Sequence, residues 1–271
     1  MEQRVSISIT DGVADVRLVR ADKMNALDAL MFEALVDASA RLAKEKGLRA
    51  VVLSGEGRAF CAGLDMGRFA AMKDNGGHGI PGGDQRDLSI RSHGLANFAQ
   101  QAVWGWRQLP VPVIAAIHGV AFGGGFQLAL GADMRFLAPD ARMSIMEIKW
   151  GLVPDMAGTP ILATLVRDDI LRELTYTGRI FSAQEALSYG LATRICDDPR
   201  AAALEVAIEI AGKSPDAIRA AKRMLNQLSV DPGPALLAES VEQQKLLGSD
   251  NQLEAVRANI EKRAPRFADA G

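Results

Sequence analysis

The sequence predicts an α/β protein, with a strand-rich core over residues 1–198 and a helical region over residues 199–271. Two alternating apolar segments separated by a turn begin the chain, as in a strand hairpin. A strand-type segment followed by helical periodicity then recurs several times, without an exact internal repeat. Towards the end of the chain apolar residues recur at helical spacing only. These three observations predict one α/β core with an appended helical region.

Length and composition limit the classes of function. The 271 residues are 48% hydrophobic and 24% charged, which is ordinary for a globular protein and enough for one large domain or two modest ones. A net charge of -2 without basic blocks, and no apolar run of membrane-spanning length, predict neither a nucleic-acid nor a membrane partner. Cys61 and Cys196 form no disulfide framework or metal-ligand spacing, and residues 1–4 carry no signal pattern. We therefore expect a cytoplasmic protein without a metal.

The first half of the chain alternates between short strands and helices. Apolar alternation or continuous apolar runs mark the strands, and glycine or proline marks the helix ends. The predicted elements are a hairpin of strands at 5–9 and 13–19, a connector at 20–27, a helix at 28–46, a strand at 49–54, a glycine-punctuated turn at 55–66, a loop at 67–94 and a helix at 96–108. A loop as long as 67–94 within a compact domain is usually functional or mobile. The sequence assigns no role to it or to its histidines.

The second half begins with an apolar strand at 113–117, which meets a tight glycine turn and opens straight into an apolar helix. Strands at 133–137 and 142–145 follow, and the pattern becomes helical after Pro154. Stops recur at Gly178, Gly190 and Pro199, and Ser214-Pro215 has the form of a helix start. Amphipathic helices are predicted at 234–247 and 250–262.

Two glycine-flanked turns at strand ends are the strongest chemical signal. Three adjacent glycines, 123–125, let the backbone approach a ligand, and the first amides of the helix that follows are unpaired. One such turn by itself is equally compatible with close packing of a helix on a strand. A second turn, near Leu64, could supply another backbone amide. Two donors that converge on one carbonyl oxygen stabilise the charge of an enolate.

Four segments resemble a known family in their residues, order and spacing. They are Gly57-Arg58-Ala59-Phe60-Cys61-Ala62-Gly63-Leu64-Asp65, the run Ile117 to Gly125, the segment from Met146-Glu147 to Pro154-Asp155, and the connector Lys23-Met24-Asn25-Ala26-Leu27. Together they resemble the crotonase family, also called the enoyl-CoA hydratase/isomerase family, and residues 261–267 fit the same pattern. The resemblance covers nearly the whole chain.

This resemblance implies a fold, an assembly and a substrate. The fold is a spiral of strand–strand–helix (ββα) units with a C-terminal helical trimerisation region, assembled as a homotrimer or a dimer of trimers. The substrate is an acyl-CoA thioester, with no permanently bound cofactor, whose carbonyl oxygen the amides of Leu64 and Gly124 hold. The resemblance also implies substrate binding by Lys23, Met24, Ala26 and Ala62, with Lys262 and Phe267 reaching the coenzyme of a neighbouring subunit.

Three polar positions decide the reaction. Family hydratases hold glutamates at the positions of Gln127 and Glu147, and these activate a water; an amide at 127 cannot take up a proton. Asp155 stands where hydratases commonly have glycine, and here the chain is similar to family isomerases that carry an aspartate. The dienoyl-CoA isomerases among them usually have a third acid at the position of Gln127, which this chain lacks.

The leading hypothesis is an enoyl-CoA double-bond isomerase. Asp155 is its principal base, Glu147 its second proton carrier, and Gln127 contributes to substrate binding. The first alternative is an enoyl-CoA hydratase in which Gln127 only positions a water. The second is a catalytically weak acyl-CoA-binding subunit. The sequence does not identify the acyl chain or separate a trimer from a hexamer.

The other candidate residues have simpler interpretations. Asp65 is predicted to stabilise its turn, and His118 to be a hydrogen-bonded core residue. His78 and His93 lie in the loop, where a single histidine is usually solvated. An aryl-CoA dehalogenase of the same family would hold a tryptophan at the position of Glu147, which argues against that activity.

Overall fold

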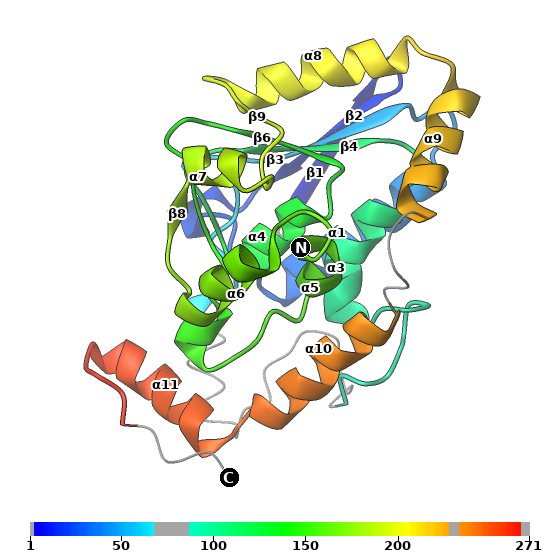
Figure 1. Ribbon diagram of the computed structural model, residues 1–271. Helices are drawn as coiled ribbons and strands as arrows, with labels where there is room; N and C mark the ends of the chain where they lie inside the picture. Colours follow the sequence, from blue (N-terminus) through cyan, green and yellow to red (C-terminus); the bar gives the residue numbers. More distant parts are fainter. Residues whose placement is uncertain (1–2, 68–86, 228–232, 267–271) are drawn as a thin grey trace.

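A two-strand hairpin forms one edge of the main sheet (Figure 1). The structure is a computed structural model that describes residues 3–67, 87–227 and 233–266. Strands β1 (Val5–Thr10) and β2 (Val13–Leu18) pair antiparallel around Asp11 and Gly12, whose φ angles of 50° and 80° permit the tight turn. All later pairs in this sheet are parallel, and the strand order is β1-β2-β3-β4-β6-β9, with β3 at Ala50–Gly55, β4 at Val113–Ile117, β6 at Met134–Leu137 and β9 at Arg194–Ile195.

A second, smaller sheet lies beside the first. It consists of β5 (Val120–Phe122), β7 (Arg142–Ser144) and β8 (Phe181–Ser182) in the order β5-β7-β8. Cys61 joins it through a parallel bridge to Ala121. Each passage of the chain therefore gives one strand to the main sheet and the next to the small sheet, as β4 with β5 and β6 with β7 show. This alternation is the ββα spiral that the resemblance implies.

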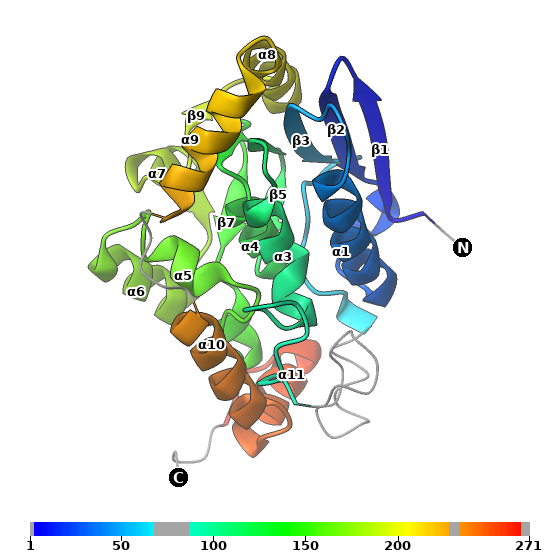
Figure 2. The ribbon, with the colours of Figure 1, turned by 90° about the vertical axis from the view of Figure 1, so that its right-hand side faces the viewer.

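Helices cover both faces of the main sheet (Figure 2). One face packs on α1 (Ala29–Ala43), α3 (Phe98–Gln108) and α4 (Gly124–Leu130), which enclose the larger apolar core. The other face packs on α8 (Pro199–Ala211), where Ala203 and Ala207 contact a second cluster that includes Val52 and Phe136. Asp28 caps α1 by accepting a hydrogen bond from the Met31 amide (2.8 Å), and Asp198 caps α8 through the Ala201 amide (2.9 Å). Polar caps of this kind set where each helix begins.

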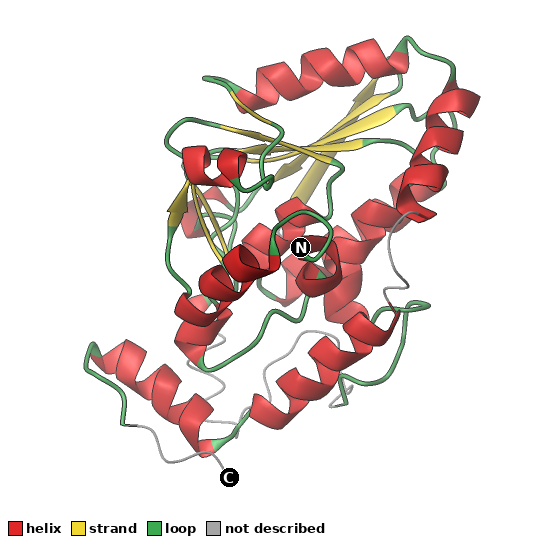
Figure 3. Ribbon diagram, in the orientation of Figure 1, coloured by secondary structure: helices red, strands yellow, loops and turns green. Residues whose placement is uncertain are grey.

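The last two helices, α10 (Gly233–Leu246) and α11 (Asp250–Glu261), lie at the end of the molecule opposite α8 (Figure 3). Helix α10 packs against α5 (Gly158–Leu162), and α11 packs against the short 3₁₀ helix η2 (Glu147–Trp150). The others are η1 (Ala21–Lys23), α6 (Asp168–Thr177), α7 (Ala183–Ser188) and α9 (Pro215–Gln227). Among the described residues, no helix combines the length and the apolar composition needed to span a bilayer.

Most predicted elements are present, and the differences concern very short ones. The strand at 49–54 is β3, and the helix at 28–46 is α1 with ends trimmed by one and three residues. The prediction of a single tight glycine turn between strand 113–117 and the next helix is wrong, because β5 lies between β4 and α4, and only Gly123 separates β5 from the helix. Strands β8 and β9 are two residues each, too short for periodicity to reveal. The predicted boundary between core and helical region at 198/199 stays a prediction. Helix α8, which follows this boundary, packs directly onto the main sheet of the core.

Candidate active site

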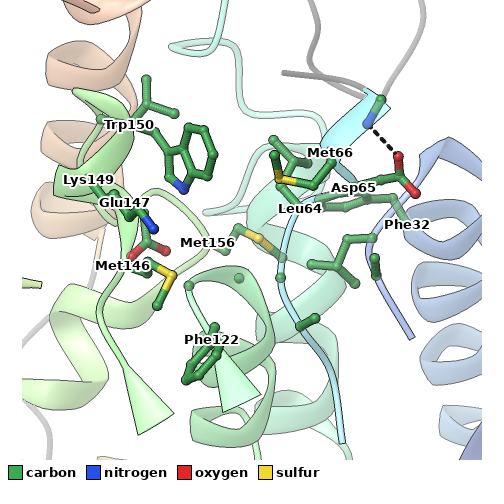
Figure 4. A pocket seen from close by; sticks show the side chains of 18 of the residues that line it. Phe32, Leu64, Asp65, Met66, Phe122, Met146, Glu147, Lys149, Trp150 and Met156 are labelled. Carbon is green, nitrogen blue, oxygen red and sulfur yellow. Dashed lines mark hydrogen bonds between the residues drawn. The ribbon is translucent and has the colours of Figure 1, made fainter. Parts of the chain in front are cut away.

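A cavity of about 840 Å³ opens between the two glycine turns and the group formed by η2, α10 and α11 (Figure 4). It brings together eight of the site residues predicted from the sequence: Lys23, Met24, Ala26, Ala62, Leu64, Gly124, Glu147 and Asp155. Its apolar lining includes Leu27, Phe32, Met66, Phe122, Met146, Trp150, Leu152, Met156 and Leu247. An apolar cavity with a few convergent polar groups is typical of a small-molecule site.

The two glycine turns are pressed together backbone to backbone. Phe122 N–H donates to the Cys61 carbonyl, and Cys61 N–H donates to the Val120 carbonyl, both at 3.1 Å. A Cβ on Gly63, whose φ is +88°, would lie 2.5 Å from the Phe122 carbonyl oxygen. A Cβ on Gly125 would clash in the same way with the Cys61 carbonyl. Glycine at these positions therefore allows the two turns to meet.

Two backbone amides at this junction remain available to a ligand. Leu64 and Gly124 both line the cavity, and Gly124 is the first residue of α4. Within the described part of the chain, neither N–H donates a hydrogen bond to a protein acceptor. Because unpaired N–H groups at a helix start favour negative charge, the pair can accept an oxygen that becomes anionic.

Glu147 is the first of two carboxyl groups that face the cavity. It begins η2, and its Oε1 accepts a hydrogen bond of 2.6 Å from Nε2 of Gln127. Its Oε2 is buried and has no hydrogen-bond partner within the described residues. Burial raises the pKa of Glu147 to about 7, although the Gln127 hydrogen bond opposes that rise. Both protonation states are therefore accessible near neutral pH.

Asp155 is the second carboxyl group and lies between α5 and η2 in the sequence. Burial raises its pKa to about 8, and the negative charges of Glu147 and Glu239 add to that rise. A hydrogen bond from the Gln243 side chain acts in the opposite direction. Two carboxyl groups that face one cavity with raised pKa values can exchange one proton between them and a bound molecule.

Gln127 lies behind Glu147, away from the residues that line the cavity. Its side chain is 1% exposed, and its Oε1 accepts hydrogen bonds from Met156 N–H (2.9 Å) and Gly158 N–H (3.0 Å). Its NH₂ group is directed at Glu147, so the amide is satisfied at both ends. A direct contact between Gln127 and substrate stays a prediction, since in this structure the residue acts on Glu147 and on the loop that follows Asp155.

The connector before α1 forms part of the cavity wall. Met24 and Asn25 have φ angles of 49° and 55°, and the buried Asn25 amide donates to the carbonyls of Glu56, Ala59 and Phe60. Arg20 lines the cavity and pairs with Asp65 at 2.6 Å. Despite partial burial, hydrogen bonds from Arg20 and from the Gly67 N–H hold the pKa of Asp65 below its usual range. These contacts agree with the predicted turn-stabilising role of Asp65.

Some predicted residues lie elsewhere. Lys262 ends α11, is exposed and does not line the cavity, and Phe267 and His78 lie outside the described residues. His118 Nε2 donates a hydrogen bond to the Gly57 carbonyl (2.9 Å), but the residue is only half-buried, so its predicted place in the core is wrong. His93 Nδ1 forms a hydrogen bond with the Ser92 hydroxyl. Within residues 3–67, 87–227 and 233–266, no three His, Cys, Asp or Glu side chains gather as a metal site.

Sequence reasoning missed the contribution of the last two helices. Gln243 of α10, Leu247 directly after this helix and Asn259 of α11 line the cavity, and Glu239 binds the backbone of the loop that carries Asp155. The signal for this contribution is the presence of polar side chains, Glu239 and Gln243, on the buried face of α10. The sequence does not show which face of the helix is buried, so the signal can be read only from the structure.

The raised carboxyl pKa values predict an unusual pH dependence of stability. Burial raises the pKa of Glu147 and Glu239 to about 7 and that of Asp155 to about 8, whereas unfolded carboxyls titrate near 4. The folded state then binds more protons than the unfolded chain between about pH 5 and 8. We expect the free energy of unfolding to fall as pH rises through this window, by at most about 1.4 kcal/mol per unit for each group.

Denaturant unfolding at a series of pH values measures this slope. Asp155→Asn removes one of the three groups and should make the slope shallower, with a melting temperature about 2–6 °C above wild type at pH 8. A stability that is flat or rising from pH 5 to 8 would contradict the assignment of raised pKa values to these carboxyls.

Comparison with known proteins finds one family throughout. A sequence profile described as enoyl-CoA hydratase/isomerase matches residues 8–270. A carnitinyl-CoA dehydratase from Proteus mirabilis is 33% identical over 275 residues, covering 98% of this chain and 99% of the relative. The mitochondrial Delta(3,5)-Delta(2,4)-dienoyl-CoA isomerase of Mus musculus is 32% identical over 270 residues, covering 95% and 80%. The crystal structure of an enoyl-CoA hydratase/isomerase from Pseudoalteromonas atlantica has a TM-score of 0.83 at 29% identity, covering 98% of this chain and 100% of that one.

Proposed function

The chain belongs to the enoyl-CoA hydratase/isomerase family, and on this premise we propose that it moves a double bond in an enoyl- or dienoyl-CoA thioester. Membership confirms the family predicted from the four motifs and makes an acyl-CoA thioester the substrate class. The isomerase proposal goes one step further. It is carried by one observation, that Glu147 and Asp155 face the same cavity with pKa values raised to about 7 and about 8.

The proposed reaction moves one proton between two carbons of the acyl chain. The ionised carboxyl of the pair removes a proton from the carbon next to the thioester or from an allylic carbon. The C–H electron pair forms a new double bond towards the carbonyl, and the N–H groups of Leu64 and Gly124 donate to the resulting enolate oxygen. The protonated carboxyl then gives its proton to another carbon, and the double bond shifts. After this step the first carboxyl is protonated and the second is ionised. Proton exchange with water returns both to their starting states.

The surroundings of each carboxyl set where the shared proton rests. The hydrogen bond from Gln127 favours the ionised form of Glu147, and the charge of Glu239 favours the protonated form of Asp155. Asp155 as the principal base was the sequence-based assignment. The proposal keeps both residues as proton carriers, and each direction of the reversible shift uses one of them first.

Incubation with 3-enoyl- and 3,5-dienoyl-CoA thioesters in heavy water tests the proposal. We expect a conjugated product with deuterium at the two carbons between which the proton moved, and no new hydroxyl group. NMR of the product reads both positions in one experiment. Absence of deuterium in the acyl chain with every thioester of the series would contradict isomerisation and favour an acyl-CoA-binding subunit of weak activity.

Hydration or dehydration is the second candidate, favoured by the similarity to a carnitinyl-CoA dehydratase. In the sequence-based alternative Gln127 positions the water, but in the structure its amide is hydrogen-bonded to Glu147, Met156 and Gly158 and does not line the cavity. Glu147 and Asp155 would then activate the water together. Rapid appearance of a 3-hydroxyacyl-CoA from crotonyl-CoA, lost in Glu147→Gln, would favour this reaction over the double-bond shift.

The binding path and the assembly belong to the same proposal. Lys23, Met24, Ala26 and Ala62 line the cavity and are proposed to hold the coenzyme. A homotrimer or dimer of trimers is proposed from the family resemblance, with Lys262 and Phe267 near the coenzyme of a neighbour. Light scattering on the eluting protein would measure the assembly state.

A further inference from the structure

Glu239 is a buried carboxyl group that the proposed reaction does not use. It lies on α10, is 5% exposed, and accepts three hydrogen bonds. Thr159 N–H donates to its Oε1 at 2.7 Å, and Ala157 N–H and Gln100 Nε2 donate to its Oε2 at 3.0 and 3.1 Å. The Thr159 side chain also hydrogen-bonds to it. Protonation would turn one of these acceptor oxygens into a donor, so the surrounding donors favour the charged form, which predominates above the pKa of about 7 to which burial raises this group.

The loop that Glu239 holds is the one that carries Asp155. Three side chains that are distant from the loop in the sequence accept hydrogen bonds from its backbone N–H groups. Gln243 Oε1 accepts from Val153 N–H at 3.1 Å, Gln127 accepts from the amides of 156 and 158, and Glu239 accepts from those of 157 and 159. Asp155 lies between the first and second of these anchors.

The loop is in a conformation that needs such anchors. Ala157 has a φ of +65°, in the left-handed region that residues with a Cβ seldom adopt. Strained backbone persists where the surrounding contacts fix it. Glu239 binds the amide of Ala157 itself and that of Thr159, the second residue of α5. Its contacts therefore lie directly on the strained residue next to the Asp155-Met156 pair.

We propose that Glu239 is the positioning residue of Asp155: it fixes the loop that carries this carboxyl group and places a negative charge behind it. The inference rests on the proposed function, in which Asp155 is a proton carrier. It assigns to α10 an indirect part in the chemistry of a site whose two carboxyl groups, Glu147 and Asp155, come from earlier in the chain. Glu239 touches no substrate in this scheme and acts through the loop.

The charges around Glu239 support the electrostatic part of the proposal. Asp155 faces it from the loop, and the Arg91 guanidinium interacts with it from the segment before α3. Arg91 is itself held by Gln100 Oε1 (2.9 Å) and Ser240 Oγ (2.9 Å), so its charge is fixed in place. The charge of Glu147 also raises the pKa of Asp155. Removing the charge of Glu239 should therefore make Asp155 easier to ionise.

Glu239→Gln tests this inference by the pH profile of kcat/KM. The variant keeps the shape but presents an NH₂ group to one of the backbone donors. We expect the limb that follows Asp155 ionisation to move to lower pH by about one unit, with an approximately 10-fold lower kcat and little change in KM. Glu239→Asp keeps the charge, and its limb should stay at the wild-type pH even if its shorter side chain lowers kcat.

A second readout separates this inference from the proposed function. Amide hydrogen exchange, followed by NMR, should become at least 10-fold faster at Ala157 and Thr159 in Glu239→Gln, while amides of β3 and β4 exchange as in wild type. Faster exchange with an unmoved pH limb would overturn the positioning role and leave Glu239 a structural residue. Unchanged turnover in Asp155→Asn would instead overturn the role of Asp155 as a proton carrier in the proposed function, and the exchange data would still report whether Glu239 holds the loop.

Discussion

Asp155→Asn is expected to lower the rate of double-bond isomerisation by about 100- to 10,000-fold. The amide has the size of the carboxyl group but neither takes up nor releases a proton at neutral pH. Glu147 remains in the cavity and keeps its hydrogen bond from Gln127. Exchange of deuterium at the carbon that Glu147 faces should therefore persist, although no isomer is released. Initial rates with 3-enoyl- and 3,5-dienoyl-CoA, together with NMR in heavy water, measure both quantities.

Asp140→Asn is the matched control for this variant. Asp140 is an exposed aspartate between β6 and β7 and is absent from the residues that line the cavity, so its rate should equal that of wild type. The melting temperature of Asp155→Asn should be no lower than that of wild type, which separates lost chemistry from a lost fold. If Asp155→Asn isomerises at the wild-type rate, Asp155 has no part in the reaction.

The α/β core could be predicted because its strands and helices are long enough to show their periodicity. Strand β3 is apolar from Ala50 to Leu53 and becomes a central strand of the main sheet. Helix α1 shows apolar residues at helical spacing and an aspartate cap. Strand β5 could not be predicted in this way. Its three residues follow Gly119 and precede Gly123, and only pairing with β7 and Cys61 makes them a strand.

The candidate site was predictable where it rests on local motifs. Leu64, Gly124, Glu147 and Asp155 lie in segments with recognisable residues, and the structure brings all four to one cavity. The orientation of Gln127 was not predictable, because it depends on the amides of residues 156 and 158, which reach it only in the folded chain.

The contribution of α10 was hidden for a related reason. The segment was predicted to be an amphipathic helix, and a helix is present, but its inward face holds Glu239, Ser240 and Gln243 beside Leu236. Polar residues on the buried side cancel the apolar stripe that such a prediction looks for. Glu239 and Gln243 accept hydrogen bonds from backbone amides of a loop that is distant in the sequence, and no local sequence pattern predicts this pairing.

The glycines of the two turns determine how closely the two backbones approach each other, which the sequence motifs alone do not show. Gly63 and Gly125 are required because opposite backbone carbonyls occupy the space of a Cβ. The close approach fixes the distance between the amides of Leu64 and Gly124, each one residue away from such a contact. The oxyanion site proposed here is therefore a property of the contact between two turns, and a change at either turn should disturb both amides.

Gly63→Ala is expected to lower kcat/KM by about 100-fold or more, as loss of an oxyanion donor does, and to destabilise the fold by at least about 3 kcal/mol. The new methyl group would lie 2.5 Å from the Phe122 carbonyl oxygen, so the turns must separate. It also forces a residue with a Cβ to adopt a φ of +88°. Initial rates and denaturant unfolding measure the two effects.

Gly47→Ala separates backbone strain from the clash. Gly47 has a φ of +81°, but nothing lies within 4 Å of the position of its Cβ. This variant should lose about 1–2 kcal/mol of stability and keep wild-type kcat/KM, because only the left-handed backbone is affected. The difference between the two variants then measures the contact between the turns. Equal losses of stability, with equal activity, would show that the amides of Leu64 and Gly124 do not depend on that contact.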